Sequence, residues 1–449
     1  MEHNLKDLYE NYCQTKKIPF SDILDSDKLK PIFEKFLPKK SRNRIYTPSA
    51  TICAFVSQVL NSDSSCNQAV ATFVAHNAAK GKSINSSSTC SYCGARKRLP
   101  EKLVYSITCQ VGNDLHNQAD RKWKWKGRDV KIVDGTTTSM ADTPANQKVY
   151  PQSKSQNEGI GFPIARIVAI SSLAMGSFLD FAIGPNCGKK TGEHALLREL
   201  LHNFKPGDVC LGDQYYCSYF LIAELMSMGV DVAFPLHASR TFDPNSGVNI
   251  DKDDHITEWE KPNRPDWMSK EVYLKVNDKI KVRETNIGNN VVIVSTFLNT
   301  KKIKKKDIKE LYESRWNIET DLFSLKEVLH MGVLRCNTPE MVRKEISIQL
   351  LAYNLVRTVM AQAAKLNNKK PRSISFKGAK QNILAYSIHF QYAKPNKLFK
   401  LQLNMLDAIA QNIVGNRPGR HEPREVKRRN KKLPFMTVPR STQKKLNLA

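Results

Sequence analysis

Acidic residues are scarce in this chain of 449 residues. Its 43 Asp and Glu stand against 70 Lys and Arg, which gives a formal net charge of +27 at pH 7. Such a shortage of negative charge excludes an acidic, solvating protein. A broad cationic surface usually neutralises phosphates, so the composition favours a polyanionic partner such as nucleic acid. A basic enzyme without such a partner is the alternative that composition alone leaves open.

Long hydrophobic runs are absent as well. The best apolar run, Ile167 to Leu179, has 13 residues and includes three serines and a glycine, so it is too short to cross a membrane. The N-terminal stretch MEHNLKDLYENY is charged and lacks the apolar region of a signal peptide. We therefore expect a cytoplasmic protein that has no membrane partner.

The cysteines lack the dense, regular spacing of a secreted disulfide framework, because the ten of them are scattered along the whole chain. Cys90 and Cys93 form a CxxC pair, and a zinc site would need two further ligands at suitable spacing. Cys53, Cys66 and His76 lie upstream, but their spacing matches no zinc-finger pattern. We expect reduced thiols, and a zinc site is the less favoured alternative.

Hydrophobic periodicity divides the chain into segments of different character. Helix-type periodicity dominates the N-terminal part, where Thr47 and Pro48 open an amphipathic stretch. Strand-type runs begin at Val130 and return with β-hairpin character before residue 300. The expected segments are an N-terminal helical DNA-binding domain (1–110), the first part of a catalytic core (120–236), a β-rich insertion (237–300), the second part of the core (301–365) and a C-terminal helical region with a basic tail (366–449).

The order of elements within these segments predicts a mixed sheet covered by helices. In the core we expect strands at 130–133, 164–173, 178–183, 209–211 and 230–236, and helices at 192–204 and 218–228. In the insertion we expect hairpin strands at 272–276, 280–285 and 291–297. Further helices are expected at 339–365 and 398–414.

Much of the positive charge lies in short basic segments. Residues 301–309 contain six lysines, and the tail after Asn416 carries eleven positive residues and two acids, which is typical of an extended segment. In residues 121–131 two tryptophans alternate with basic residues. That pattern indicates either an approach to nucleic acid or tryptophans that simply pack on the core.

A helix is expected over residues 307–330, with Asp307 as its N-cap and Glu310 completing a capping box. At 100° per residue, four polar side chains fall within about 60° of arc and form one stripe: Tyr312, Arg315, Glu319 and Lys326. Five apolar residues form a second stripe beside it: Leu311, Ile318, Leu322, Leu325 and Leu329. The alternative is a solvated surface with one Arg–Glu pair worth a few tenths of a kcal/mol.

Two aspartates, Asp134 and Asp213, each follow an apolar run and lie beside a glycine. Together with Glu319 they can form a cluster of three carboxylates, whose mutual repulsion would raise their pKa values. Divalent cations with a preference for oxygen ligands, Mg²⁺ or Mn²⁺, relieve this repulsion. Two such ions about 3.5–4 Å apart can hold the attacking and leaving oxygens of a phosphodiester. In a basic protein the pattern indicates phosphoryl transfer on nucleic acid.

These motifs together resemble the bacterial DDE transposases of the insertion sequence 4 group. The signature Y-x2-R-x3-E-x6-K is matched at all four positions from Tyr312 to Lys326. The D-G-T at Asp134 and the G-D-x-x-x-C-S-Y around Asp213 are similar to the two aspartate motifs of the group. The basic tail is similar too, so the resemblance covers about residues 45–445.

The resemblance implies an α/β fold: a ribonuclease H-like mixed-sheet catalytic core with an all-β insertion and an N-terminal helical domain. It implies that Asp134, Asp213 and Glu319 are catalytic and bind two Mg²⁺ ions, for which Mn²⁺ can substitute. The implied partners are double-stranded DNA, as transposon ends and target, and a second copy of the chain in the complex that pairs the ends. The implied location is the bacterial cytoplasm, in association with the nucleoid.

The same resemblance implies a DNA-binding role for Tyr312, Arg315 and Lys326 beside the cut. In relatives an aromatic residue of the insertion stacks on a base turned out of the duplex. Trp259 and Trp267 are the candidates for that residue, and burial inside the insertion is the alternative for both.

Two further polar residues, His237 and Glu193, are candidates for a supporting role beside the metal-binding acids. His237 is interpreted as a polar residue at a strand end, rather than as a helper of the catalytic acids. Glu193 opens a helix, where the helix dipole stabilises an acid that has no catalytic duty.

The function we expect is therefore that of an active transposase. It would bind the inverted-repeat ends of a mobile element, cleave there by two-metal phosphoryl transfer and join the 3′ ends to target DNA. Two alternatives remain: a DNA-binding descendant without catalysis, and a ribonuclease H-like nuclease without strand transfer.

Overall fold

A nine-stranded mixed sheet forms the centre of the protein in a computed structural model. The structure describes residues 29–38, 45–78, 86–188 and 191–415, with residues 27, 81, 437–439 and 442–443. The strands are β1 (Val130–Ser139), β2 (Ile164–Ser172), β3 (Phe178–Pro185), β4 (Val209–Leu211), β5 (Asp231–Pro235), β6 (Val248–Asp251), β7 (Asp254–Glu260), β8 (Lys279–Asn286) and β9 (Val292–Ser295).

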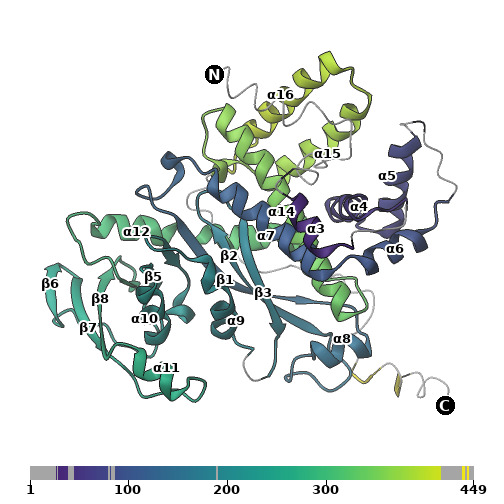
Figure 1. The fold of residues 1–449 in the computed structure, drawn as a ribbon. Helices are drawn as coiled ribbons and strands as arrows, with labels where there is room; N and C mark the ends of the chain where they lie inside the picture. Colours follow the sequence, from purple (N-terminus) through teal and green to yellow (C-terminus); the bar gives the residue numbers. More distant parts are fainter. Residues whose placement is uncertain are drawn as a thin grey trace.

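Their order across the sheet is β3-β2-β1-β4-β5-β9-β8-β7-β6 (Figure 1). β1, β2 and β3 form an antiparallel meander, and β4 and β5 run parallel to β1. Three antiparallel strands followed by two parallel ones that cross over through helices are the arrangement expected for a ribonuclease H-like core. The predicted fold class is therefore confirmed.

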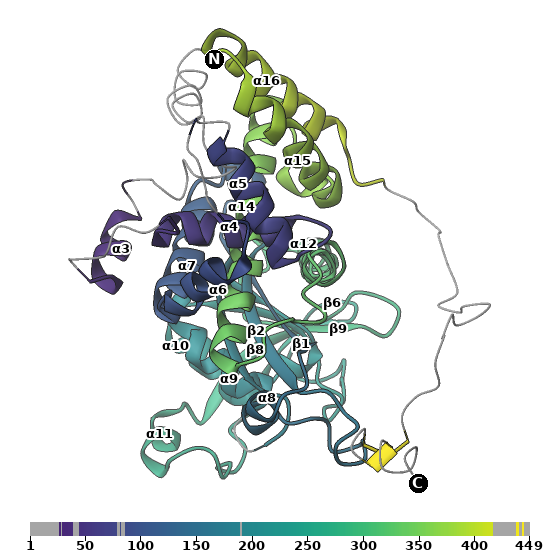
Figure 2. The same ribbon diagram turned by 90° about the vertical axis from the view of Figure 1, so that its right-hand side faces the viewer.

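Helices cover both faces of this sheet and extend beyond it at either end (Figures 1 and 2). They are α3 (Lys30–Phe36), α4 (Pro48–Leu60), α5 (Cys66–Ala78), α6 (Thr89–Arg98), α7 (Glu101–Asn117), α8 (Pro144–Val149), α9 (Glu193–Leu200), α10 (Tyr219–Ser227), α11 (Lys270–Lys275), α12 (Lys305–Glu313), α13 (Trp316–Phe323), α14 (Pro339–Leu366), α15 (Phe376–Tyr392) and α16 (Pro395–Gln411). None of the helices in the described part of the chain is long and apolar enough to cross a membrane.

Alternation along the strands supplies two hydrophobic cores, one on each face of the sheet. Ile132 joins the core that also contains side chains of α7 and α14. Its neighbour Val133 points the other way and joins the core that contains α9 and α10. Because successive side chains of a strand face opposite sides, one apolar run in β1 holds both helical layers.

The insertion does not form a separate sheet, because β9 pairs with β5 and continues the core sheet into β8, β7 and β6. One predicted strand in it is wrong: residues 272–276 belong mostly to helix α11. Ser269 caps that helix through its hydroxyl, which accepts a hydrogen bond from the Val272 amide at 3.3 Å. The alternation of Val272, Leu274 and Val276 is typical of a strand, but the serine cap before it favours a helical turn.

The predicted single helix over 307–330 is also wrong, because it is divided into α12, α13 and a π-helical turn, Ser324–Val328. The break lies at Ser314, whose hydroxyl donates to the Leu311 carbonyl at 2.5 Å, and such back-bonding bends helices. Asp307 is not the N-cap; it is the third residue of α12, and its carboxylate accepts from the Lys304 amide at 2.8 Å.

Of the candidate binding elements in the sequence, the structure describes the CxxC pair but not the basic segments near the two ends of the chain. Cys90 and Cys93 lie on α6 as free thiols. Within the described residues no group of three or more His, Cys, Asp or Glu side chains is arranged to hold a metal ion. The basic segments at 39–44 and 417–436 lie outside the described residues, while α15 is a helix that the sequence analysis missed.

Candidate active site

Asp134 lies within β1 rather than at its end, because the strand continues through three threonines to Ser139 in register with β2. Beyond Ile132 the strand no longer pairs with β4, so the carboxylate lies where the two parallel strands separate. Its Oδ1 accepts a hydrogen bond from the Gly135 amide at 2.7 Å. Burial raises the pKa of Asp134 to about 7, and the nearby Asp213 and Glu193 carboxylates add to that increase.

Asp213 follows β4, the neighbour of β1, after a single glycine. It caps the short 3₁₀ turn Gln214–Tyr216, where its Oδ1 accepts from the Tyr215 amide at 2.9 Å. Parallel strands bring their carboxyl ends to the same edge of a sheet. Asp134 and Asp213 are therefore brought together as the sequence predicted, close enough for the Asp213 carboxylate to raise the pKa of Asp134.

Glu319 is held by Arg315 on the adjacent helical turn. The guanidinium lies 2.8 Å from Oε1 of Glu319, and the pair is partly shielded from solvent. Arg315 also interacts electrostatically with Asp134. Its positive charge partly opposes the increase in the pKa of Asp134 that burial causes. The break at Ser314 sets the direction of this turn, so it bears on the position of both side chains.

Lys326 lies in the π-helical turn after α13. Burial lowers the pKa of its ammonium group, and the charges of Glu327 and Asp134 oppose that effect. Lys326 and Arg315 therefore both act electrostatically on Asp134. π-Helical turns are rare and occur frequently at functional sites, and the sequence pattern gave no sign of this one.

Glu193, to which the sequence analysis gave only a helix-dipole role, lies against the aspartates. A Cβ added to Gly135 would be 2.3 Å from the Glu193 Cδ, so the glycine after Asp134 leaves space for this carboxyl group. Its Oε2 accepts from the Tyr216 hydroxyl at 3.2 Å. Burial raises the pKa of Glu193, and Asp213 contributes to the increase. In the sequence, the glycine after Asp134 is the feature that could have indicated a side chain packed against this aspartate.

A cavity of about 640 Å³ opens beside Asp213, between the core, the insertion and α12. Tyr312 and Arg315 line it from the helical side. Phe242 and His237 line it from the segment after β5, and the Phe242 ring packs on His255 with centroids 5.2 Å apart. The Y-x2-R part of the signature and an aromatic residue of the insertion thus share one cavity.

Neither tryptophan candidate is among the residues that line this cavity. Trp259 is 5% exposed, its indole N–H donates to Glu284 at 2.8 Å, and Arg240 covers its ring at 3.8 Å. Trp259 therefore takes the alternative that the sequence left open, burial inside the insertion. Trp267 is 49% exposed and packs against Arg198, with the guanidinium 3.9 Å from its ring centroid.

Helix α13, which carries Glu319, is anchored by Asp321 on its opposite side. Asp321 is fully buried and accepts hydrogen bonds from Arg357 at 2.5 Å, Arg372 at 2.6 Å and the Tyr353 hydroxyl at 2.7 Å. Arg372 also donates to the Leu173 and Ser172 carbonyls between β2 and β3. This network ties the glutamate-bearing helix to the sheet.

The donor chemistry of the site suits a hard divalent cation. Carboxylate oxygens are the ligands that Mg²⁺ and Mn²⁺ prefer, and Asp134, Asp213 and Glu193 repel one another in a buried place that a cation would neutralise. Glu319 is the predicted ligand that stays apart, because its Oε1 is engaged by Arg315. The residues therefore fit such an ion once Glu319 exchanges that partner.

A core of this strand order, with one aspartate on β1, a second just after the parallel strand β4 and a glutamate on a later helix, defines the ribonuclease H-like class of nucleic-acid enzymes. Residues 125–355, just over half of the chain, match the Transposase DDE domain family, and the chain belongs to that family. The resemblance inferred from the sequence motifs is thereby confirmed.

One relative by sequence agrees with the family. The chain is 24% identical over 369 residues to the transposase InsG for insertion sequence element IS4 of Escherichia coli (strain K12), and the alignment covers 78% of each protein. The chain also aligns with the cryo-EM structure of a piggyBac transposase synaptic complex with hairpin DNA. That alignment has a TM-score of 0.42 and 10% identity, and covers 93% of this chain and 87% of the other.

Proposed function

We propose that this DDE transposase is active and cleaves the ends of a mobile element, then joins its 3′ ends to target DNA. The observation that carries the proposal is the position of Asp134, which interacts with the acids Asp213 and Glu193 and with the cations Arg315 and Lys326. Acids that bind a metal beside cations that bind phosphates are what a phosphodiester requires.

In this proposal Asp134, Asp213 and Glu319 hold two Mg²⁺ ions, and Mn²⁺ can replace them. Bound Mg²⁺ supplies Lewis-acid stabilisation of the charge on the attacking and leaving oxygens. Arg315 releases Glu319 and takes a phosphate oxygen instead, for which its planar guanidinium offers two donors. Lys326 adds a point charge near Asp134 and so draws the scissile phosphate toward the acids.

We propose that the cavity beside Asp213 receives a base that has turned out of the duplex. Tyr312 would form a hydrogen bond with the DNA backbone of that nucleotide. Phe242 replaces the two tryptophans as the stacking residue, because it lines the same cavity as Tyr312 and Arg315. Base–aromatic stacking contributes about 1–3 kcal/mol per base. We expect Phe242→Ala to slow cleavage of a paired end about tenfold or more, while an end with an unpaired base at that position restores the rate.

For Phe242 the matched control is Trp267→Ala, which removes an exposed aromatic residue away from this cavity and is expected to leave cleavage unchanged. Equal losses on paired and unpaired ends would contradict a stacking role for Phe242. If only Trp267→Ala slowed cleavage, Trp267 rather than Phe242 would be the stacking residue.

The activity itself is tested with Mg²⁺ and labelled terminal inverted repeats, identified from the DNA that flanks the gene. We expect the wild type to cut and join, and Asp134→Ala and Glu319→Ala to bind the same DNA without cutting it. If the wild type binds but never cuts, the chain is a DNA-binding descendant. If it nicks but never joins ends to a target, it is a nuclease.

A further inference from the structure

Five lysines surround the start of α12 on the protein surface. They are exposed, and none of them takes part in the ion pairs formed among the described residues: Lys301, Lys302, Lys304, Lys306 and Lys309. Asp307 is the single acid of residues 301–309. Its two carboxylate oxygens are already engaged, one by Lys126 at 2.9 Å and the other by the Lys304 amide at 2.8 Å. The charge of this lysine cluster is therefore left unbalanced.

The other basic segment of the core, residues 121–128, is different although it lies next to the cluster. Three of its five basic side chains are paired with acids: Lys124 with Asp129 at 2.9 Å, Lys126 with Asp307 at 2.9 Å and Arg128 with Asp231 at 2.7 Å. Trp125 packs on Phe297 with ring centroids 5.4 Å apart. This segment thus packs against the base of α12, and a smaller part of its charge is left for phosphates than in the lysine cluster.

The lysines also stand at the less favourable end of the helix. The N-terminus of an α-helix carries a partial positive charge that favours acids in the first turn, and like charges close together repel. A sequence that places lysines there accepts an electrostatic cost, which a bound polyanion would relieve.

Helix α12 connects this cluster to the active site. Tyr312, in its last turn, lines the cavity beside Asp213, and Lys309 lies one turn before it, about 60° around the helix. From Lys305 to Tyr312 the helix rises about 10 Å, which corresponds to about three steps of a DNA strand at ~3.4 Å each. A duplex whose scissile phosphate is at Asp213 can therefore lay nearby phosphates on the lysines.

We propose that this lysine cluster binds the backbone of the same duplex that carries the scissile bond, a few base pairs from the cut. The proposal rests on the transposase activity proposed above and adds a second contact surface to it. The partner is double-stranded DNA bound through its phosphates, so the contact fixes the position of the duplex and carries no sequence information.

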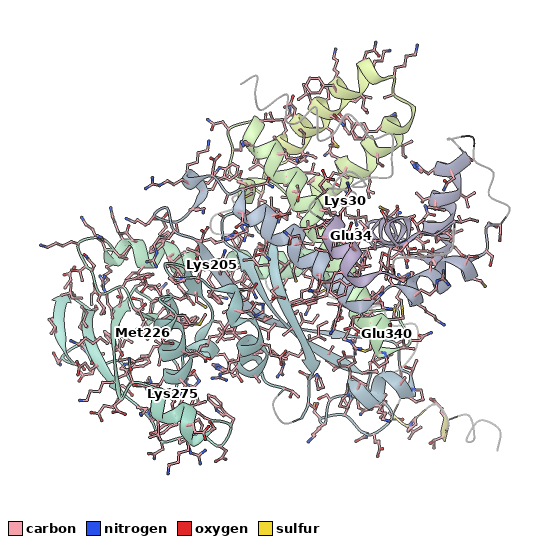
Figure 3. The ribbon with its side chains drawn as sticks, in the orientation of Figure 1. Lys30, Glu34, Lys205, Met226, Lys275 and Glu340 are labelled. Atoms are coloured by element: carbon pink, nitrogen blue, oxygen red, sulfur yellow. The ribbon has the colours of Figure 1, made fainter. Side chains whose placement is uncertain are left out.

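The test compares Lys302→Gln/Lys309→Gln with the control Lys270→Gln/Lys275→Gln, which removes two exposed lysines from α11. Figure 3 places Lys275 at the far end of the insertion from α12, so the control is distant from the proposed contact. Affinity for a terminal-repeat duplex with flanking sequence is measured over a range of salt. We expect the slope of log K against log salt to fall by about 1.8 for the α12 variant and to stay unchanged for the control.

Phosphate-ethylation interference then locates the contact. In the wild type, ethylation a few base pairs from the cut should weaken binding, and that interference should vanish in the α12 variant. An unchanged salt slope overturns the proposal, and so does a variant that binds the element end normally but loses capture of target DNA. A wild type that binds but never cuts would instead overturn the proposed activity, whatever the slopes are.

Discussion

At the residue scale, the site is organised around one partly buried aspartate. Asp134 interacts electrostatically with two acids and two cations, and desolvation is the main reason why its pKa is raised to about 7. The glycine after it leaves space for Glu193, so a fourth carboxyl group stands beside the predicted acids. Such a site is costly when empty and is stabilised by whatever cation neutralises it.

The raised pKa of Asp134 predicts a pH-dependent stability. A carboxyl group whose pKa is higher in the folded than in the unfolded state loses stabilisation as pH rises from about 4 through about 7. In EDTA, Asp134→Asn should therefore be more stable than the wild type above pH 7, by on the order of 1–2 kcal/mol, and the difference should shrink toward pH 4. Chemical denaturation at several pH values measures it.

Magnesium should reverse this order of stability between the wild type and Asp134→Asn. Because an ion that binds only the folded state stabilises it, Mg²⁺ should raise the melting temperature of the wild type and leave that of Asp134→Asn nearly unchanged. Equal shifts for both proteins would place the ion elsewhere.

Arg315 and Lys326 are predicted to contact phosphates. Replacing either with alanine should weaken binding of the terminal-repeat duplex and reduce the salt slope by about 0.9, because each change removes one phosphate contact. Fluorescence anisotropy across a salt series measures both effects, and Lys275→Ala serves as the control. Unchanged slopes for both variants would remove the two side chains from the DNA interface.

At the element scale, the helix that carries the Y-x2-R-x3-E-x6-K signature is the informative case. Its apolar stripe is buried as expected, since Leu311, Ile318 and Leu325 are fully enclosed. The polar stripe is divided by a break at Ser314 and by the π-helical turn at Lys326. Periodicity places residues on a face, but local hydrogen bonds and the anchor at Asp321 decide where that face points.

The Asp321 anchor predicts a large loss of stability. Asp321→Asn leaves the guanidinium groups of Arg357 and Arg372 without their shared buried counterion, so we expect a loss of about 3–5 kcal/mol in the free energy of unfolding. Asp27→Asn removes an exposed ion pair with Lys30 and should leave the free energy of unfolding nearly unchanged. Urea denaturation compares the two, and similar small losses would show that the anchor is not needed.

At the scale of the whole molecule, one continuous sheet carries both the catalytic core and the insertion. The cavity beside Asp213 is closed on one side by the segment after β5 and on the other by α12, so the insertion shapes the site that the core acids supply. The net charge of +27 is likewise not uniform, because three of the five basic side chains in residues 121–128 are paired with acids, while the five exposed lysines around α12 are in no ion pair among the described residues.

A whole-molecule prediction concerns stoichiometry. One chain supplies a single set of the proposed catalytic acids Asp134, Asp213 and Glu319, whereas a mobile element has two ends to be cut. We therefore expect two chains and two terminal-repeat duplexes in the complex that forms on DNA, as measured by light scattering coupled to size exclusion. One chain per duplex at saturating DNA, in a preparation that cuts, would contradict the paired assembly.

Local periodicity in the sequence predicted the five core strands, although β1 continues to Ser139, and it missed β6 and β7 of the insertion. The spacing of the motifs identified the two aspartates and the four signature residues as candidates, because motif spacing is a local property. The order of the strands across the sheet and the contacts between side chains came only from the tertiary structure. It brought Glu193 to the aspartates, buried Trp259, and placed Phe242 with Tyr312 around one cavity. It also paired three basic side chains of residues 121–128 with acids and left the exposed lysines around α12 without ion pairs among the described residues. Burial and ion pairing depend on residues distant in the chain, and no local pattern carries that information.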